Sequence, residues 1–336
     1  MAGGIRKLRK IQLGRETTAG TKVDATTYWR GTGTIEDNMS LVFPDEDVGY
    51  KGGVNRSYIS KYEALLDLEE TPATFEQILH ILEMGVESAA ASQDGSGSGY
   101  VYVYPFNQTS DTGSVKSYTV EGGDNSGEEE FAYGFCTDFT LSGVPGEAVM
   151  MQANIVGRQV STGTFTSTTT ATIPTVEEIL FGKGKIYIDG DTVTWGNTQK
   201  TSFWRGFEFR CNTGWEPQYT GDGSLYFTFA KNVGPEIRCD ITMEHNADAI
   251  TEIAAWRART ARKLRLIFEG TAFTTAGTSF TYKTLRISMV GSWEDFTPLD
   301  DMDGDDVVTG TFRVAYDPDA AAFCEIYVVP ALAAVQ

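Results

Sequence analysis

The sequence contains few of the residues that most often carry acid–base catalysis or bind transition metals. Two histidines, His80 and His245, occur among 336 residues, and each lacks a second histidine or a cysteine at the spacing of a metal site. We therefore expect structural or surface roles for both. The four cysteines form no C-x-x-C pair, which predicts free thiols in a reducing compartment. They are Cys136, Cys211, Cys239 and Cys324.

Long apolar runs are also missing. The longest, such as Tyr100–Tyr104 and Ala331–Val335, are far shorter than the roughly 20 residues that cross a bilayer as a helix. The segment Met1–Gly14 is basic but includes neither an apolar core nor a cleavage site, so we expect no secretory signal. We therefore expect no contact with a membrane.

Basic residues are scarce relative to acidic ones. The chain has 27 Lys and Arg against 46 Asp and Glu, a formal net charge of -19. Proteins that hold nucleic acid do so mainly by neutralising phosphates with basic residues. This balance argues against a nucleic-acid-binding function and predicts that the chain repels DNA.

The residues that are abundant are typical of β-structure. Glycine (36), tyrosine (15) and phenylalanine (19) accompany many threonines and serines, which is a composition of strands and turns. Apolar residues make up 41% of the chain, enough to form hydrophobic cores. At roughly 150 residues per domain, the length predicts about two domains.

A weak internal repeat supports two domains. The tripeptide Trp-Arg-Gly occurs at Trp29–Gly31 and again at Trp204–Gly206, each time before a run of alternating, strand-like residues. A helix is predicted after each copy. In the first copy, Thr71 is the expected N-cap and Pro72 the first helical residue. In the second copy, Asn246 is the expected N-cap.

Each copy ends in a predicted β-hairpin, at Phe135–Ile155 in the first and at Leu285–Tyr316 in the second. The repeated unit is therefore a set of strands, one helix and a hairpin. We predict a first domain at residues 1–160, a Ser/Thr-rich linker at 161–180 and a second domain at 181–336.

The run Asp300–Asp306 is the strongest candidate for a metal site, because calcium is bound by several hard oxygens close together. In an EF-hand-like loop that starts at Asp301, however, the sixth residue is Asp306 rather than glycine, and the twelfth is Phe312 rather than glutamate. We expect an acidic hairpin turn and leave open whether it binds a cation. We find no catalytic constellation, and we expect neither enzymatic activity nor a cofactor.

The alternating tyrosines Tyr100, Tyr102 and Tyr104 line one face of a predicted strand. We expect this face to be buried in a sheet, although the same pattern can stack sugars. A secreted or surface β-sandwich that binds carbohydrate is therefore the alternative function. A β-rich hydrolase that uses paired acids is a further alternative, but pairs are unavoidable among 46 acidic residues.

Charge is unevenly placed along the chain. The N-terminal arm is basic, the first predicted helix and its flanks are acidic, and the end of the second helix is basic. Such faces are either solvated or part of a charge-complementary contact between the domains of an assembly. The residues concerned are Arg6, Lys7, Arg9 and Lys10 in the arm, Glu69, Glu70, Glu76, Glu83 and Glu87 around the first helix, and Arg257, Arg259, Arg262, Lys263 and Arg265 after the second.

Several short stretches of the first half and the linker carry a family resemblance. They are Gly14–Thr21, Trp29–Gly31, Gly53–Tyr58, Glu70–Gly85, Tyr118–Asn125, Phe139–Gly143 with Gly146–Ala148, and Pro174–Gly182. In these stretches the chain resembles the major tail tube proteins of long-tailed, siphovirus-type bacteriophages. The second half is less distinctive.

The resemblance implies a mainly β fold, with two tandem antiparallel β-sandwich or partial-barrel tail-tube domains and a flanking helix in each. It implies subunits that form rings, and rings that stack into the tube through which the viral genome reaches the host. Family members with one domain form hexameric rings, whereas those with a duplicated domain form trimers that mimic a hexamer. The two predicted domains therefore favour a trimer.

The resemblance also implies partners: further copies of the chain, the tape-measure protein that fills the tube during assembly, and the tail-tip and tail-terminator proteins. The implied location is the virion, after assembly in the cytoplasm of the bacterial host. DNA would pass through the lumen without specific binding, and repulsion by an acidic wall extends about 8 Å at physiological salt. The candidate assembly-interface residues are Arg6, Lys7, Arg9, Lys10, Asp45, Glu46, Asp47, Tyr50, Arg56, Arg257, Arg259 and Arg262.

Overall fold

The computed structural model describes residues 3–52, 56–108, 115–318 and 321–335. Residues 53–55, which belong to one of the stretches that carry the family resemblance, lie outside these ranges. The protein is mainly β, with 48% strand, 8% helix and two α-helices in the part of the chain that is described. The predicted fold class is therefore confirmed at the level of a mainly β protein built on a large antiparallel sheet.

Strands dominate both halves of the chain. The first half contains a 3-10 turn at Arg6–Leu8, β1 (Lys10–Arg15), β2 (Thr27–Tyr28), β3 (Gly33–Asp37), β4 (Ser40–Val42), β5 (Tyr58–Lys61), β6 (Ala64–Pro72), α1 (Ile78–Gly85), β7 (Ser92–Gln93), β8 (Tyr100–Pro105), β9 (Tyr118–Gly123), β10 (Glu128–Gly143), β11 (Met150–Gly157) and β12 (Ser161–Thr162). The second half contains a 3-10 turn at Phe181–Lys183, β13 (Gly184–Gly190), β14 (Gln199–Lys200), β15 (Trp204–Asn212), β16 (Trp215–Gln218), β17 (Phe229–Asn232), β18 (Glu236–Glu244), α2 (Ala247–Ala258), β19 (Arg262–Ala272), β20 (Tyr282–Phe296), β21 (Asp300–Met302), β22 (Asp305–Val314) and β23 (Cys324–Val329).

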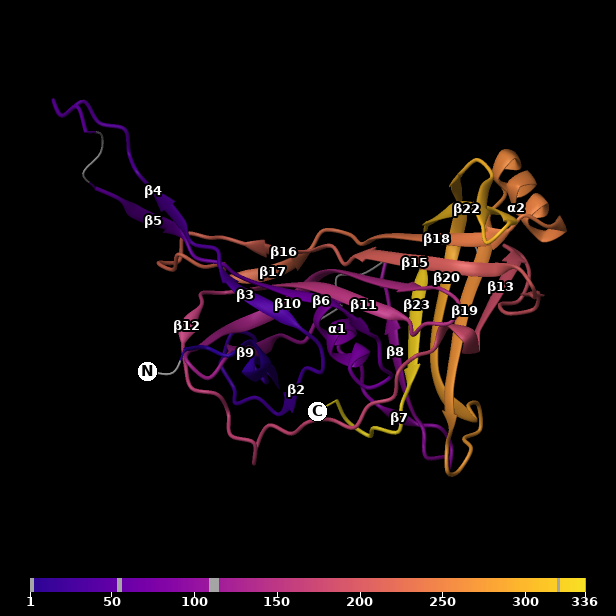
Figure 1. Ribbon diagram of the computed structural model, residues 1–336, viewed down its shortest axis with the longest axis horizontal. Coiled ribbons are helices and arrows are strands. Elements are labelled where there is room, and N and C mark those ends of the chain that lie inside the picture. Colours follow the sequence, from indigo (N-terminus) through magenta and orange to yellow (C-terminus); the bar gives the residue numbers. More distant parts are fainter. Residues whose placement is uncertain (1–2, 53–55, 109–114, 319–320, 336) are drawn as a thin grey trace.

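Two long strands, β10 and β20, organise the sheet (Figure 1). The beginning of β10 pairs with β9 and β12, and its end pairs with β11 and β15. In the second half, β20 pairs with β19, β22 and β23. Because each long strand passes from one set of neighbours to another, the described strands of both halves form one continuous hydrogen-bonded network, apart from the separate pairs β4–β5 and β16–β17.

The two halves meet in two strand ladders. Residues Asp138–Gly143 of β10 pair with Phe207–Asn212 of β15, and β8 of the first half pairs with β23 at the end of the second. The hydrophobic core is also continuous across this junction, where the rings of Phe139 and Phe209 lie 5.9 Å apart. The predicted duplication stays a prediction, but the two segments share a sheet and a core.

The two helices differ in their environment. Every residue of α1 is buried, and Figure 1 places the helix beneath the strands of the first half. The N-cap predicted at Thr71 and Pro72 is wrong, because β6 continues to Pro72, which pairs with Met150 of β11. The helix begins later, at Ile78, after the Thr74 hydroxyl accepts a hydrogen bond from the Gln77 N–H.

The second helix, α2, lies on the outer flank of the other half (Figure 1). Here the predicted N-cap is confirmed: Asn246 Oδ1 accepts hydrogen bonds from the N–H groups of Asp248 (2.9 Å) and Ala249 (3.2 Å). These contacts satisfy two of the donors that a helix N-terminus leaves unpaired.

Both predicted hairpins are confirmed, as β10–β11 and as β20–β22 with the short strand β21 in its turn.

Tyr102 and Tyr104 are buried, as expected for the inner face of a strand. The four cysteines are buried and free. The segment predicted as a linker packs along the first half, where Thr172 donates its N–H to Thr26 and Leu180 bridges to Ala148.

Candidate assembly surfaces

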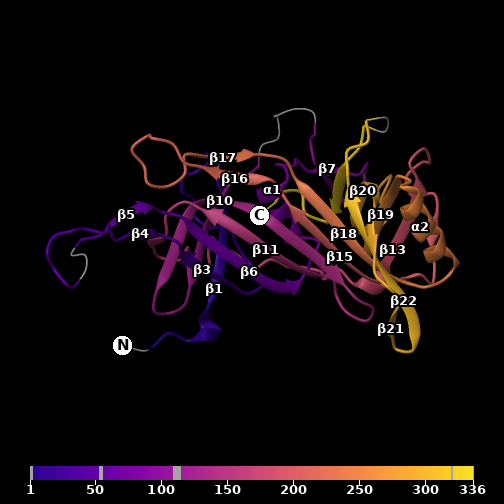
Figure 2. The ribbon, with the colours of Figure 1, turned by 90° about the horizontal axis from the view of Figure 1, so that it is seen from above.

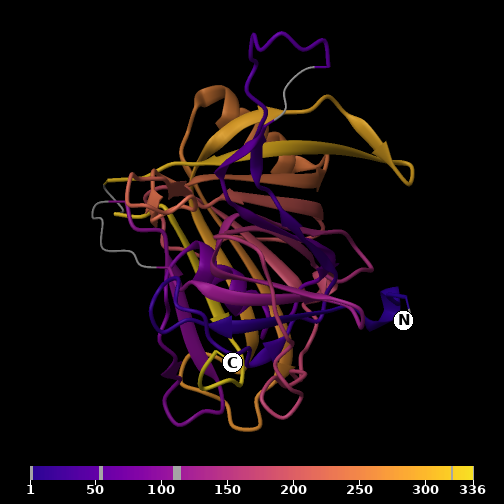
Figure 3. The same ribbon diagram turned by 90° about the vertical axis from the view of Figure 1, so that its left-hand side faces the viewer.

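A two-stranded arm, described at residues 38–52 and 56–61, is the most prominent projection of the molecule. It consists of β4, β5 and the described residues of the loop between them, and it extends away from the body in all three ribbon views (Figures 1–3). Six large apolar side chains of the arm each expose between 46% and 71% of their surface. They are Met39, Leu41, Phe43, Val48, Tyr50 and Tyr58. Single exposed apolar residues are ordinary, but six on one projection are an unusual concentration.

The arm is anchored at its base. Asn38 donates its backbone N–H and its side-chain amide to the carbonyl and carboxylate oxygens of Glu63. Next to this, Tyr62 donates its N–H to the carbonyl of Leu225. Beyond the base, β4 and β5 pair with each other and with no further strand of the described chain. An isolated pair of strands is marginally stable in water.

Five of the predicted interface residues lie on the outer part of the arm. One of them, Arg56, has an ion-pair partner within the chain. Arg56 forms an ion pair with Glu46, which is partly covered. Asp45, Asp47 and Tyr50 are exposed. The arm therefore combines exposed apolar side chains with two exposed carboxylates.

A second hairpin, β16–β17, runs beside the arm and in the same direction (Figure 2). Tyr219 connects the two, because its hydroxyl donates to Glu63 (3.1 Å) and its ring lies 4.9 Å from the Lys61 ammonium. Leu225 and Phe229 of this hairpin are also exposed. The sequence analysis missed this surface, although the turn residues of Gly221–Gly223 between aromatic positions are a hairpin signal.

The basic N-terminal arm borders a groove of about 560 Å³. Arg6, Lys7 and Arg9 are exposed. Lys10 is engaged within the chain, where its ammonium lies 3.8 Å from the centre of the Phe165 ring. The groove is also lined by two acidic residues of β10, Glu128 and Glu129.

The three predicted arginines around α2 have different roles. Arg257 and Arg259 are exposed. Arg262 instead donates to the buried Glu252 (2.9 Å), which also accepts from the Trp293 indole N–H (3.0 Å). Arg262 therefore stabilises the fold, and its guanidinium is not a free surface group.

The acidic face predicted for the first helix is wrong for its central residues. Glu83 is fully buried and accepts two hydrogen bonds from Arg15, at 2.8 and 2.9 Å, and one from Tyr118. Burial raises the pKa of Glu83, and Arg15 opposes that rise. Glu76 is likewise buried and pairs with Lys283 (2.7 Å). Both partners come from strands distant in sequence, so spacing along the helix did not reveal them.

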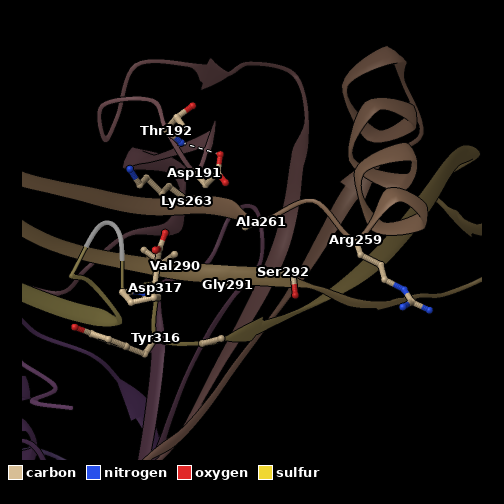
Figure 4. A pocket seen from close by; sticks show the side chains of 12 residues that line it. Asp191, Thr192, Arg259, Ala261, Lys263, Val290, Gly291, Ser292, Tyr316 and Asp317 are labelled. Carbon is tan, nitrogen blue, oxygen red and sulfur yellow. Dashed lines mark hydrogen bonds between the residues drawn. The ribbon is translucent and has the colours of Figure 1, made fainter. Parts of the chain in front are cut away.

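A pocket of about 630 Å³ is lined by the residues that follow β13, by the start of β19, by β20 and by the residues that follow β22. Its basic side chains do not converge: in Figure 4, Arg259 extends away from Lys263. The Lys263 ammonium already donates to the carbonyl of Val193 (3.0 Å). The pocket therefore offers no concentrated positive charge to an anion.

The acidic run Asp300–Asp306 forms the turn between β21 and β22. Met302 pairs with Asp305, and the two residues between them, Asp303 and Gly304, both have positive φ, as in a type I′ turn. Asp305 pairs with Arg205. In the described ranges no three His, Cys, Asp or Glu side chains come close enough together to hold a metal ion.

No protein-family model matches the chain, and no curated protein matches it in sequence. Among the described residues, neither helix has the length and apolar character needed to cross a membrane.

Proposed function

We propose that the protein is a tail tube subunit of a long-tailed bacteriophage, a structural virion protein that polymerises as stacked rings. The observation that carries this proposal is the projecting arm with its six exposed apolar side chains. The mainly β fold with a large antiparallel sheet agrees with the resemblance seen in the sequence.

Exposed apolar surface of this extent is costly for a protein that stays single, and burial against another protein recovers about 25 cal/mol per Å². A second copy of the same chain is the simplest partner, because polymerisation covers every arm in the same way. The exposed Asp45 and Asp47 would then meet basic groups of a neighbour, for which Arg6, Lys7, Arg9, Arg257 and Arg259 are the candidates.

The proposal includes the ring and its partners. A trimer of two-domain subunits is favoured over a hexamer, and the tape-measure, tail-tip and tail-terminator proteins are the further partners. The chain would act in the virion after assembly in the host cytoplasm, as a genome channel rather than an enzyme and without a cofactor. Its net charge of -19 suits a wall that does not bind the DNA passing through it.

The alternative, a carbohydrate-binding β-sandwich, relied on Tyr100, Tyr102 and Tyr104. Tyr102 and Tyr104 are buried, and Tyr102 donates its hydroxyl hydrogen to the carbonyl of Leu332. They cannot stack against a sugar from this position, so the observation that motivated the alternative no longer supports it.

Substitution of the arm tests the proposal. We expect the variant Phe43→Ser/Tyr50→Ser to remain folded and to lose assembly into tubes, because it removes the two most exposed apolar side chains of the arm. Lys51→Ser, a change at the neighbouring exposed position, should assemble as the unchanged protein does. Sedimentation of concentrated protein measures this, and equal assembly of both variants would contradict the role of the arm.

A further inference from the structure

A polar segment, residues 161–172 and here called the strap, crosses over the start of β10. Its first residues form β12, in which Ser161 and Thr162 pair with Glu130 and Glu129. Gly163 then donates its N–H to the carbonyl of Glu128 (3.2 Å). The strap itself contains no ionisable side chain. Any pH dependence of its attachment therefore comes from the surface beneath it.

Two carboxylates lie under the strap with oxygens that have no partner. Glu128 and Glu130 expose 7% and 6% of their surface. In the described part of the chain, neither Glu128 Oε1 nor Glu130 Oε2 receives a hydrogen bond. A Cβ atom added to Gly163 would lie 3.1 Å from the first oxygen and 2.6 Å from the second. Both oxygens therefore lie close to Gly163, and the strap keeps water from them.

The surrounding charges only partly balance this pair. Lys22 forms an ion pair with the other oxygen of Glu130, and the Lys10 ammonium lies nearby over the Phe165 ring. A third carboxylate, Glu121 of β9, accepts from the N–H (2.8 Å) and hydroxyl (2.6 Å) of Thr166. The open side of the groove is lined by further charged groups, namely Arg6, Lys7, Arg9, Glu69, Asp124 and Glu129.

The balance of these groups favours a bound proton. Burial raises the pKa of Glu128 to about 7, the carboxylates of Glu121 and Glu130 add to the rise, and Lys10 and Lys22 oppose it. An unpaired buried carboxylate oxygen is costly, whereas a proton shared between two carboxyl groups gives both a partner.

We propose that Glu128 and Glu130 share one proton, and that this proton holds the strap against β10. A protonated Glu128 Oε1 donates to Glu130 Oε2, so a single hydrogen satisfies both unpartnered oxygens. When the proton leaves, two anions face each other beneath Gly163, and they gain hydration only if the strap lifts. Lifting also separates the Phe165 ring from the Lys10 ammonium, while β1 keeps Lys10 paired with β9.

The sign of the effect follows from the pKa of Glu128. Because the closed structure raises this pKa above its ordinary value, the closed strap binds more protons than the open one. The closed state is therefore stabilised below the ordinary carboxyl pKa, and this stabilisation is lost as the pH rises through about 7.

Hydrogen exchange of the strap in the full chain tests the proposal. The variant Glu128→Gln carries an amide that donates to Glu130 at every pH, whereas Glu129→Gln removes an exposed charge from the next residue as a control. At pH 5.5 the unchanged protein and Glu128→Gln should exchange alike. At pH 8 the strap of the unchanged protein and of Glu129→Gln should exchange about tenfold faster than that of Glu128→Gln. Comparison at one pH cancels the intrinsic pH dependence of exchange.

Equal strap exchange in the unchanged protein and Glu128→Gln at pH 8 would overturn the proposal. A second measurement needs no variant: the glutamate carboxyl ¹³C signals of the unchanged protein, followed from pH 4 to 9. The signal assigned to Glu128 should titrate near neutral pH. Completion of the Glu128 titration below pH 5.5 would show that no proton is shared.

Discussion

Two buried carboxylates of the helices are each held by one cation from a strand. Glu83 is held by Arg15 of β1, Glu252 by Arg262 of β19, and neither carboxylate is open to solvent. Removal of one partner from such a pair is strongly destabilising, because the other charge is left buried and uncompensated. At the scale of single residues, a charged side chain in such a buried pair stabilises the fold, whereas an exposed one is available to a partner.

The arginines around α2 test the difference between a buried ion pair and an exposed charge. Arg262→Met keeps the aliphatic part of the side chain but leaves Glu252 without its cation, so we expect a loss of about 3 kcal/mol in the free energy of unfolding. Arg257→Met, at an exposed position, should change it by less than about 0.5 kcal/mol. Urea denaturation measures both values, and similar effects of the two substitutions would contradict the assignment.

His80 gives a second prediction at this scale. Burial, reinforced by the nearby Arg15, lowers the pKa of His80 to about 4. Tyr118 donates its only hydroxyl hydrogen to Glu83, so the Nδ1–H of His80 donates to the Tyr118 oxygen (3.2 Å). The folded protein therefore keeps the imidazole neutral, while the unfolded chain takes up a proton below its ordinary pKa of 6.5.

The consequence is a loss of stability as the pH falls from about 6.5 towards 4. We expect His80 to contribute a loss of about 2 kcal/mol between pH 7 and pH 5. His80→Gln cannot titrate, so the difference in unfolding free energy between the unchanged protein and this variant should shift by that amount. Urea denaturation at both pH values measures the shift, and a constant difference would rule out the buried neutral imidazole.

Sequence patterns predicted local contacts well and distant contacts poorly. Asn246 was recognised as a helix cap because its partners, Asp248 and Ala249, follow directly in the sequence. The acidic residues of α1 were assigned to a surface because nothing near Glu83 in the sequence points to Arg15 or Tyr118. The candidate interface set contained Arg262 because the sequence does not show how α2 and β19 pack to bring it against Glu252.

At the scale of elements, the cap of α2 allows a direct test. Asn246→Ala removes the acceptor for two backbone N–H groups, and we expect a loss of about 1 kcal/mol in unfolding free energy. Asn246→Asp keeps an acceptor at the same place and should retain most of the stability. Thermal unfolding followed by circular dichroism distinguishes the two, and an unchanged midpoint for Asn246→Ala would contradict the role of the cap.

The first helix shows why some element boundaries could not be predicted. Thr71 and Pro72 have the chemistry of a helix start, but the ladder between β6 and β11 extends across them. Sheet pairing with a strand about 80 residues away outweighs the local preference, which is weak by comparison. In β10, β11, β20 and β22 the local preference and the sheet pairing both favour a strand, and these strands were predicted correctly.

At the scale of the whole molecule, the sequence predicted the mainly β class but not the continuity of the sheet. The ladder between β10 and β15 and the ladder between β8 and β23 join strands that composition and spacing had assigned to separate domains. Long-range pairings of this kind leave no local signal, since the partners share neither a turn nor a common period.

This continuity predicts cooperative unfolding. Because residues 1–160 and 181–336 share ladders and one core, they should unfold in a single transition rather than as two independent domains. Differential scanning calorimetry measures this directly. Two well-separated transitions, with the calorimetric enthalpy divided between them, would contradict a shared core.

The central claim is that copies of this chain assemble through their projecting arms into a tube. Cryo-electron microscopy of the concentrated full-length protein tests it most directly. We predict stacked rings around a central channel, with each ring showing three repeats of a paired unit and each arm seated on a neighbouring subunit. Particles that remain single copies, even when the tape-measure and tail-tip proteins are supplied, would contradict the account.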